Sequence, residues 1–222
     1  MPKPSTASSP SPALPASPRG RRRPAEVLTA AEIGQIIEAC SRTAPTGIRN
    51  RALIVVLWRG GLRISEALAL LPKDVDSKAG TVHVLNGKGG KQRMVALDPL
   101  AFSVLAKWLE VRARLRRGPD APVFCTLDGG MIQTAYVRAF LRRIAKALGM
   151  KKRVHAHGLR HTHACELMRE RIPLNLIQKQ LGHANLAVTS RYLDHVEAPE
   201  LTEAMQRRAV PPEVAQALQP PS

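Results

Sequence analysis

The sequence predicts a mainly α-helical fold with one small antiparallel β-sheet, an α+β class. Residues that start and stop helices bracket several apolar segments, whereas only residues 81–97 read as two strands around a glycine-rich turn. Apolar side chains make up 44% of the 222 residues and aromatic ones only 3%, so the core is expected to consist mainly of Leu, Ile, Val and Ala. A chain of this length suits one or two domains.

Three helices are expected in the first half of the chain. Thr29 and Glu32 fit a capping box at the start of the first helix. The isoleucines that follow share one helical face: Ile33, Ile36 and Ile37. The second helix is expected at 48–58, where a glycine pair stops it. The third is expected at 63–71, and it ends before a proline because the residue preceding proline disfavours the α conformation.

A β-hairpin and five further helices follow. Residues 81–85 and 92–97 read as strands, and the Asn-Gly-Lys-Gly-Gly-Lys turn at 86–91 gives the hairpin a basic tip. Prolines near two helix starts and a glycine at one helix end support the boundaries of the remaining elements. These helices are expected at 98–117, 133–148, 158–170, 173–181 and 185–193.

The chain is strongly basic. It carries 34 Lys and Arg against 17 Asp and Glu, a formal net charge of +17. Such an excess on a small protein favours a polyanionic partner, usually a nucleic acid, and predicts an affinity that falls steeply with salt. Charge alone leaves open a protein that binds RNA or acidic membranes nonspecifically.

Cysteine usage and hydropathy indicate a cytoplasmic protein with no membrane segment. The three cysteines are far apart in sequence and form no paired motif, which argues for a reducing compartment: Cys40, Cys125 and Cys165. No apolar run approaches the roughly 18 residues that a membrane span requires. The N-terminus lacks the apolar core of a secretory signal. Residues 1–24 are instead rich in Pro, Ser and Ala, end in a basic run, and are predicted to be disordered.

Two arginines about a hundred residues apart in sequence are candidate phosphate ligands. Arg63 follows the glycine pair, and Arg160 lies near the start of a later helix. A guanidinium group can grip two phosphate oxygens, and two such groups could clamp one phosphodiester and stabilise charge that develops on it. Taken singly, each is more readily explained as a surface arginine, so only the joint pattern carries weight.

A lysine and a tyrosine could supply the remaining chemistry. Lys88 lies between glycines at the hairpin tip, where it could contact phosphate or donate a proton to a leaving oxygen, although a solvated turn lysine is an equal reading. Lys91 and Arg93 compete with it. Tyr192 has an ordinary pKa of about 10, but arginines beside it would stabilise the phenolate for attack on phosphorus. Tyr136 has no such neighbours and is expected to pack on its helix.

A dense histidine cluster offers an alternative reading, a metal site. Its members are His155, His157, His161 and His163. Positions 157 and 161 are spaced i, i+4 and could share a helix face. The nearest cysteine and acidic residues, Cys165 and Glu166, do not lie at metal-site spacing. We therefore expect no bound metal.

Together these segments resemble the catalytic domain of the tyrosine recombinases, the phage integrase family. The resemblance covers about residues 27–205, and Tyr192 falls at the expected distance beyond the last box. The matching segments, in family order, are the first arginine motif at 61–66, the hairpin lysine motif at 87–93, the H-x-x-R box at 157–161 and the Leu-Gly-His box at 181–183.

The resemblance implies transesterification on double-stranded DNA without metal, ATP or any other cofactor. Tyr192 would attack a scissile phosphate and form a 3′-phosphotyrosyl bond, and the working unit would be a homotetramer on two duplexes. The implied catalytic groups are Arg63, Arg160 and His183 on the phosphate, Lys88 as general acid, and His157 in proton transfer or phosphate contact, with Glu66 in support. The implied DNA contacts are Lys91, Arg93 and Arg191.

The chain departs from the usual family plan at its N-terminus. Most members carry a core-binding domain there, whereas only the basic segment at 1–24 precedes the catalytic domain expected at 25–205. Residues 206–222 are a candidate for docking on a neighbouring subunit, although two prolines interrupt them. The leading prediction is a site-specific recombinase or integrase. The alternatives are a truncated noncatalytic DNA-binding relic, a topoisomerase-like enzyme, and a metal-dependent nuclease built on the histidine cluster.

Overall fold

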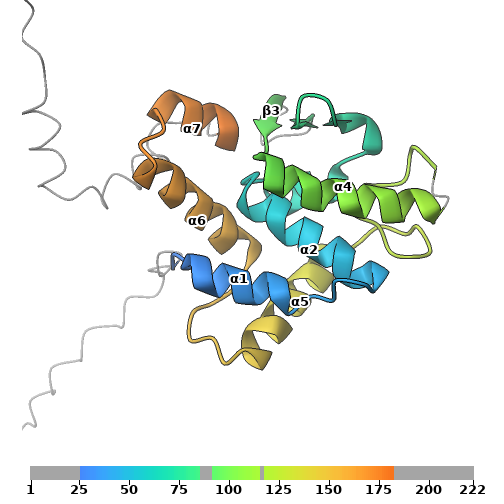
Figure 1. Cartoon of the computed structure of the whole chain (residues 1–222), viewed down its shortest axis with the longest axis horizontal. Helices are drawn as coiled ribbons and strands as arrows, with labels where there is room; N and C mark the ends of the chain where they lie inside the picture. Colours follow the sequence, from blue (N-terminus) through green and yellow to red (C-terminus); the bar gives the residue numbers. More distant parts are fainter. Residues whose placement is uncertain (1–25, 86–91, 116–117, 183–222) are drawn as a thin grey trace, which may run out of the picture.

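The structure, a computed structural model, describes residues 26–85, 92–115 and 118–182. It confirms the predicted class, because seven α-helices accompany one three-stranded antiparallel sheet in the described part of the chain (Figure 1). None of these helices combines the length and apolar character that a membrane crossing requires. The elements, in order, are α1 (Ala30–Glu38), α2 (Pro45–Trp58), α3 (Ile64–Ala69), the 3-10 helix η1 (Pro72–Asp74), β1 (Val75–Asp76), β2 (Thr81–Val84), β3 (Arg93–Ala96), α4 (Pro99–Arg114), α5 (Thr134–Ala147), α6 (Ala156–Arg169) and α7 (Leu174–Leu181).

Helix α2 is the central element, and it packs against α1, α3, α4 and α6. It is buried on nearly every side, which explains why its sequence shows no single apolar face. Two of its polar residues, Arg49 and Asn50, are buried as well. Arg49 donates hydrogen bonds to the carbonyl of Cys125 over 3.0 Å and to the hydroxyl of Tyr136 over 2.9 Å. Tyr136 also stacks on Phe140, with ring centroids 6.2 Å apart, and so packs on its helix as expected.

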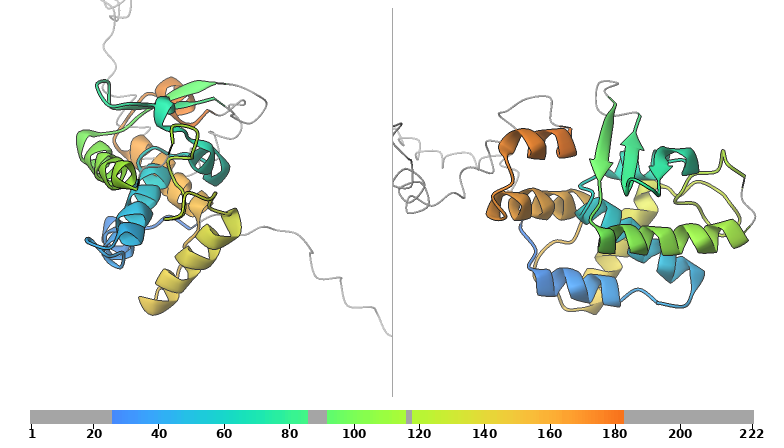
Figure 2. Two further views of the ribbon diagram at one scale, coloured as in Figure 1. Left: turned by 90° about the vertical axis from the view of Figure 1, so that its right-hand side faces the viewer. Right: turned by 45° about the horizontal axis from the view of Figure 1, so that its top comes forward.

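The sheet has the strand order β1-β2-β3, and one valine from each strand lies in a row across it. Val82 pairs with Val75 on one side and with Val95 on the other. His83, which follows Val82, and Met94, which precedes Val95, are exposed to solvent, as strand alternation requires. Helix α7 lies beside β3, and the views in Figure 2 show the hairpin standing above α4 with α7 at its flank.

Most predicted boundaries agree with the structure, and the differences have local causes. The capping box is present, with Thr29 and Glu32 exchanging hydrogen bonds of 2.7 and 3.2 Å. Helix α2 begins three residues before the predicted Ile48, at a proline suited to a first turn. Helix α3 ends two residues early, because Leu70 is already extended ahead of the proline that begins η1. Strand β1 was not predicted, since two residues are too few to form a pattern. The hairpin tip at 86–91 and the helix predicted at 185–193 lie outside the described residues.

Candidate active site

Arg63 lies at the N-cap of α3 and is held from two sides. Its backbone N–H and Nη1 donate to the carboxylate of Glu66 over 2.8 and 2.6 Å. Its Nη2 donates to the carbonyl of Gly182 over 3.4 Å. The Arg63 side chain is 28% exposed, so the oriented guanidinium group still faces solvent. This is the arrangement that a ligand for an external anion needs.

Arg160 lies in the second turn of α6 and is nearly buried, with 3% of its surface exposed. It donates to the carbonyl of Gly61 and, over 2.6 Å, to the carbonyl of Leu181. These two carbonyls orient the guanidinium group within the fold. Through these bonds Arg160 joins the loop before Arg63 to the end of α7.

Glu66 is buried between two arginines. Besides Arg63, it accepts a bidentate pair of bonds from Arg93 on β3, over 2.9 and 2.8 Å. Burial raises the pKa of Glu66, but the hydrogen bonds from Arg93 and Arg63 outweigh it and lower the pKa to about 2. Glu66 is therefore a stable carboxylate that holds both arginines in place and is not poised to move a proton near neutral pH.

Two glycines allow these segments to approach one another closely. Gly61 and Gly182 both have positive φ, of 59° and 64°. A Cβ on Gly182 would lie 2.6 Å from Cδ of Arg93, and a Cβ on Gly61 would lie 2.7 Å from Cδ2 of Leu181. A side chain at position 182 would therefore displace the Arg93 side chain, and one at position 61 would displace those of Leu181 and His163.

His157 lies in the first turn of α6, on the surface and close enough to both arginines to sense their charge. Loss of hydration lowers the pKa of His157, and electrostatic interactions with His155, Arg160 and Arg63 lower it further. A neutral imidazole at pH 7 can accept or pass on a proton, which fits the role that the resemblance implies.

The histidine cluster does not form a metal site in the described residues, where no three His, Cys, Asp or Glu side chains converge as ligands. Glu166, one of the nearest candidate ligands, instead accepts a 2.8 Å bond from the indole of Trp58 and pairs with Arg59. Nε2 of His161 lies 4.0 Å from the sulfur of Cys165. The rings of His155 and His157 lie near each other, with centroids 6.4 Å apart, but no third ligand joins them among the described residues.

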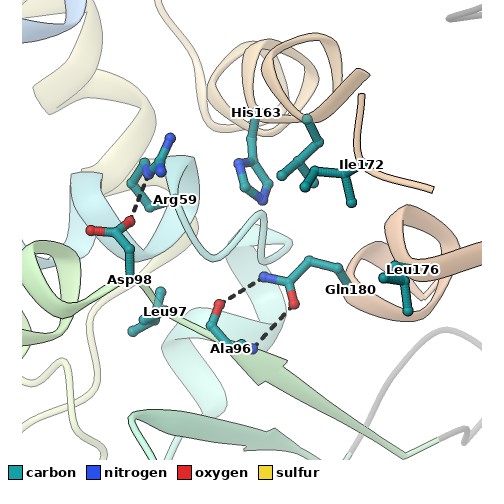
Figure 3. A pocket seen from close by; sticks show the side chains of 9 residues that line it. Arg59, Ala96, Leu97, Asp98, His163, Ile172, Leu176 and Gln180 are labelled. Atoms are coloured by element: carbon teal, nitrogen blue, oxygen red, sulfur yellow. Dashed lines mark hydrogen bonds and ion pairs between the residues drawn. The ribbon is translucent and has the colours of Figure 1, made fainter. Parts of the chain in front are cut away.

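His163 faces a pocket of about 340 Å³ between α6, α7 and the β3–α4 junction (Figure 3). Neither ring nitrogen has a hydrogen-bond partner among the described residues. Burial, followed by the charges of Arg59 and Arg160, lowers the pKa of His163 to about 3, so the ring is neutral. The ring also packs against the Gly61 backbone and thus supports the loop that carries Arg63.

The remaining predicted site residues lie outside the described ranges. They are Lys88, Lys91, His183, Arg191 and Tyr192. The structure does describe the chain up to Gly182, the residue before His183, and both Leu181 and Gly182 are bonded to the candidate arginines. Of the predicted DNA contacts, only Arg93 is described. Its guanidinium group is occupied by Glu66 and by the carbonyl of Gln180, and DNA contact by Arg93 stays a prediction.

Comparison with known proteins finds matches over most of the chain. The model of the phage integrase family matches residues 26–198. Tyrosine recombinase XerC of Xanthomonas axonopodis pv. citri (strain 306) is 36% identical over 195 residues, which are 87% of this chain and 62% of that protein. The crystal structure of XerA recombinase has a TM-score of 0.69 at 29% identity, covering 83% of this chain and 66% of that one. XerH site-specific recombinase bound to difH substrate, a pre-cleavage complex, has a TM-score of 0.67 at 32% identity, covering 82% and 53%.

Proposed function

This chain belongs to the phage integrase family, and on that premise we propose that it is a site-specific DNA recombinase that works through a covalent tyrosine intermediate. The oxygen of Tyr192 attacks a scissile phosphate, the bond from phosphorus to the 5′-oxygen breaks, and a 3′-phosphotyrosyl bond forms. The 5′-hydroxyl of a partner strand then reverses the step and releases the tyrosine. The bond energy is conserved in the intermediate, so no ATP is required. In this proposal the arginines, rather than a metal, stabilise the charge on the phosphate.

The observation that carries the proposal is the convergence of the two candidate arginines. Arg63 and Arg160 come from segments about a hundred residues apart, yet both bond to the Leu181-Gly182 backbone. The next residue is His183, so the fold supports the phosphate-binding trio that the resemblance implies. Positive charge there would stabilise the pentacovalent transition state.

The remaining groups transfer protons, hold Arg63 or contact the DNA in this proposal. Lys88 donates a proton to the leaving 5′-oxygen, and His157 assists the transfer or contacts the phosphate. Glu66 holds Arg63 and does not touch the substrate. Lys91 and Arg191 contact the DNA backbone.

The proposed partner is double-stranded DNA. The net charge of +17 favours it, as does the XerH relative, which was crystallised on a difH DNA substrate. The proposed working unit is a homotetramer on two duplexes, in the cytoplasm. The chain spans 62% of the length of its XerC relative, so the activity of that whole protein is attributed here only as part of the proposal.

The test is covalent trapping on a nicked suicide duplex in the presence of EDTA. Duplexes from the DNA that flanks the gene are incubated with the full chain and then denatured. A denaturant-resistant adduct is expected with the wild type and should be absent with Tyr192→Phe. The matched control is Tyr136→Phe at the only other tyrosine of the chain, which should still form the adduct.

The alternatives predict other outcomes, which the adduct assay and companion assays on the same protein distinguish. Gel-shift binding without any adduct would replace the proposal with a noncatalytic DNA-binding relic. Relaxation of supercoiled DNA that lacks paired sites would indicate a topoisomerase-like enzyme. Cleavage that is lost in EDTA and survives Tyr192→Phe would indicate a metal-dependent nuclease.

A further inference from the structure

The side chain of Gln180 binds helix α7 to the edge of β3. The amide of Gln180 pairs with the backbone of Ala96: Nε2 donates to the Ala96 carbonyl over 2.8 Å, and the Ala96 N–H donates to Oε1 over 3.1 Å (Figure 3). This pair imitates the bonding of a neighbouring strand. It fixes the last turn of α7, and with it the Leu181-Gly182 backbone, relative to the hairpin.

Arg93, three residues before Ala96, connects this fastening to the arginine site. Its Nε donates to the backbone carbonyl of Gln180 over 3.0 Å, while its two terminal nitrogens hold both oxygens of Glu66. The Arg93 side chain is only 9% exposed, so it acts from within the fold. The end of α7 and the Glu66 carboxylate are the two groups that orient Arg63, and Arg93 holds both of them.

We propose that Arg93, secured by Gln180, is a positioning residue that sets the orientation and the effective charge of Arg63. The inference rests on the proposed function, and it gives Arg93 a role distinct from DNA contact. Because Arg93 shares the Glu66 carboxylate, Arg63 keeps positive charge to offer to a phosphate. Without Arg93, Glu66 would neutralise Arg63 across their 2.6 Å bond and draw its guanidinium group inward.

The variant Arg93→Lys tests this directly. A lysine keeps the positive charge but cannot bridge Glu66 and Gln180 with a planar fork. Adduct formation is measured on two suicide duplexes, one with a normal scissile phosphodiester and one with a methylphosphonate there. The methylphosphonate replaces one charged oxygen with a methyl group, so its reaction depends less on the arginines.

The expected result is a selective loss. On the phosphodiester, Arg93→Lys should slow adduct formation by about a hundredfold, the effect of misplacing a group by about 1 Å. On the methylphosphonate, the loss caused by Arg93→Lys should be at least tenfold smaller. That substrate has one charged oxygen fewer, so its reaction gains less from correctly placed arginines. Gel-shift affinity for the uncut duplex should not change.

Two further variants separate positioning from general damage. Gln180→Ala removes the pairing with Ala96 at a half-buried residue and should show the same selectivity, which preserves the test if Arg93→Lys does not fold. Arg112→Lys is the matched control, since Arg112 is also buried and donates to backbone carbonyls, at the far end of α4. It should affect both substrates equally.

Four outcomes would overturn the inference. Equal losses on the two substrates would reduce Arg93 to a structural role, and weakened gel-shift binding would make it a DNA contact. Wild-type rates in both Arg93→Lys and Gln180→Ala would remove any role. An inert wild type would overturn the proposed function first, and the inference with it.

Discussion

Replacing the buried Glu66 by glutamine should destabilise the protein in a pH-dependent way. The pKa of this carboxyl falls from an ordinary 4.5 to about 2 in the folded protein. At about 1.4 kcal/mol per pKa unit, the ionised form contributes about 3 kcal/mol at pH 7. Because the folded pKa is the lower one, this contribution is present above pH 4.5 and is lost as the pH falls toward 2. Linkage gives about 1.5 kcal/mol at pH 3.

The assay is urea unfolding of wild type and Glu66→Gln at pH 7 and at pH 3, at constant ionic strength, followed by tryptophan fluorescence. The difference in the free energy of unfolding should be about 3 kcal/mol at pH 7 and about half of that at pH 3. Glu38→Gln is the control, because Glu38 is 68% exposed and its pair with Arg42 is 3.7 Å long. A Glu66 difference below about 1 kcal/mol at pH 7, the range of surface pairs, would refute the reasoning. So would a difference that does not change with pH.

Three further predictions concern backbone shape, a buried ring and a cap. Gly182→Ala should lower the melting temperature more than Gly149→Ala. The two glycines have nearly the same φ, but only a Cβ at position 182 would collide with the Arg93 side chain. Equal losses would argue against that contact. Burial lowers the pKa of His163 to about 3, so between pH 7 and pH 5 the histidine takes up a proton only in the unfolded chain. In urea unfolding, the free energy of unfolding of the wild type should therefore fall by about 2 kcal/mol relative to that of His163→Leu. The same pH dependence in both proteins would contradict this. Thr29→Ala should cost about 1 kcal/mol in the same assay and Thr29→Ser much less; equal costs would argue against the capping bond.

The sequence predicted the elements that carry a local signal. The capping box at Thr29, the paired strands and the stop at Gly182 each follow from interactions within a few residues. The family motifs likewise led to Arg63 and Arg160, because their surroundings in sequence are distinctive. What a pattern could not give is the distance between them in space, which depends on packing around α2.

The contacts that the sequence did not reveal join residues distant in sequence. Arg93 looked like one of several basic hairpin residues, yet its partner Glu66 lies 27 positions away. Gln180 was not singled out in the sequence, and nothing near it in sequence indicates its pairing with Ala96, 84 positions away. His163 read as part of a metal-like cluster, whereas α6 directs its ring toward the pocket beside the Gly61 loop.

The way these arginines are held shows how a folded protein can orient neighbouring guanidinium groups. A carboxylate beside each guanidinium group would orient it but would also cancel its charge. Here Arg63 and Arg93 share the one carboxylate of Glu66, while Arg160 is oriented by the carbonyls of Gly61 and Leu181. Desolvating such charge opposes folding. The surrounding fold must therefore supply that free energy in advance, which is the preorganisation that transition-state stabilisation requires.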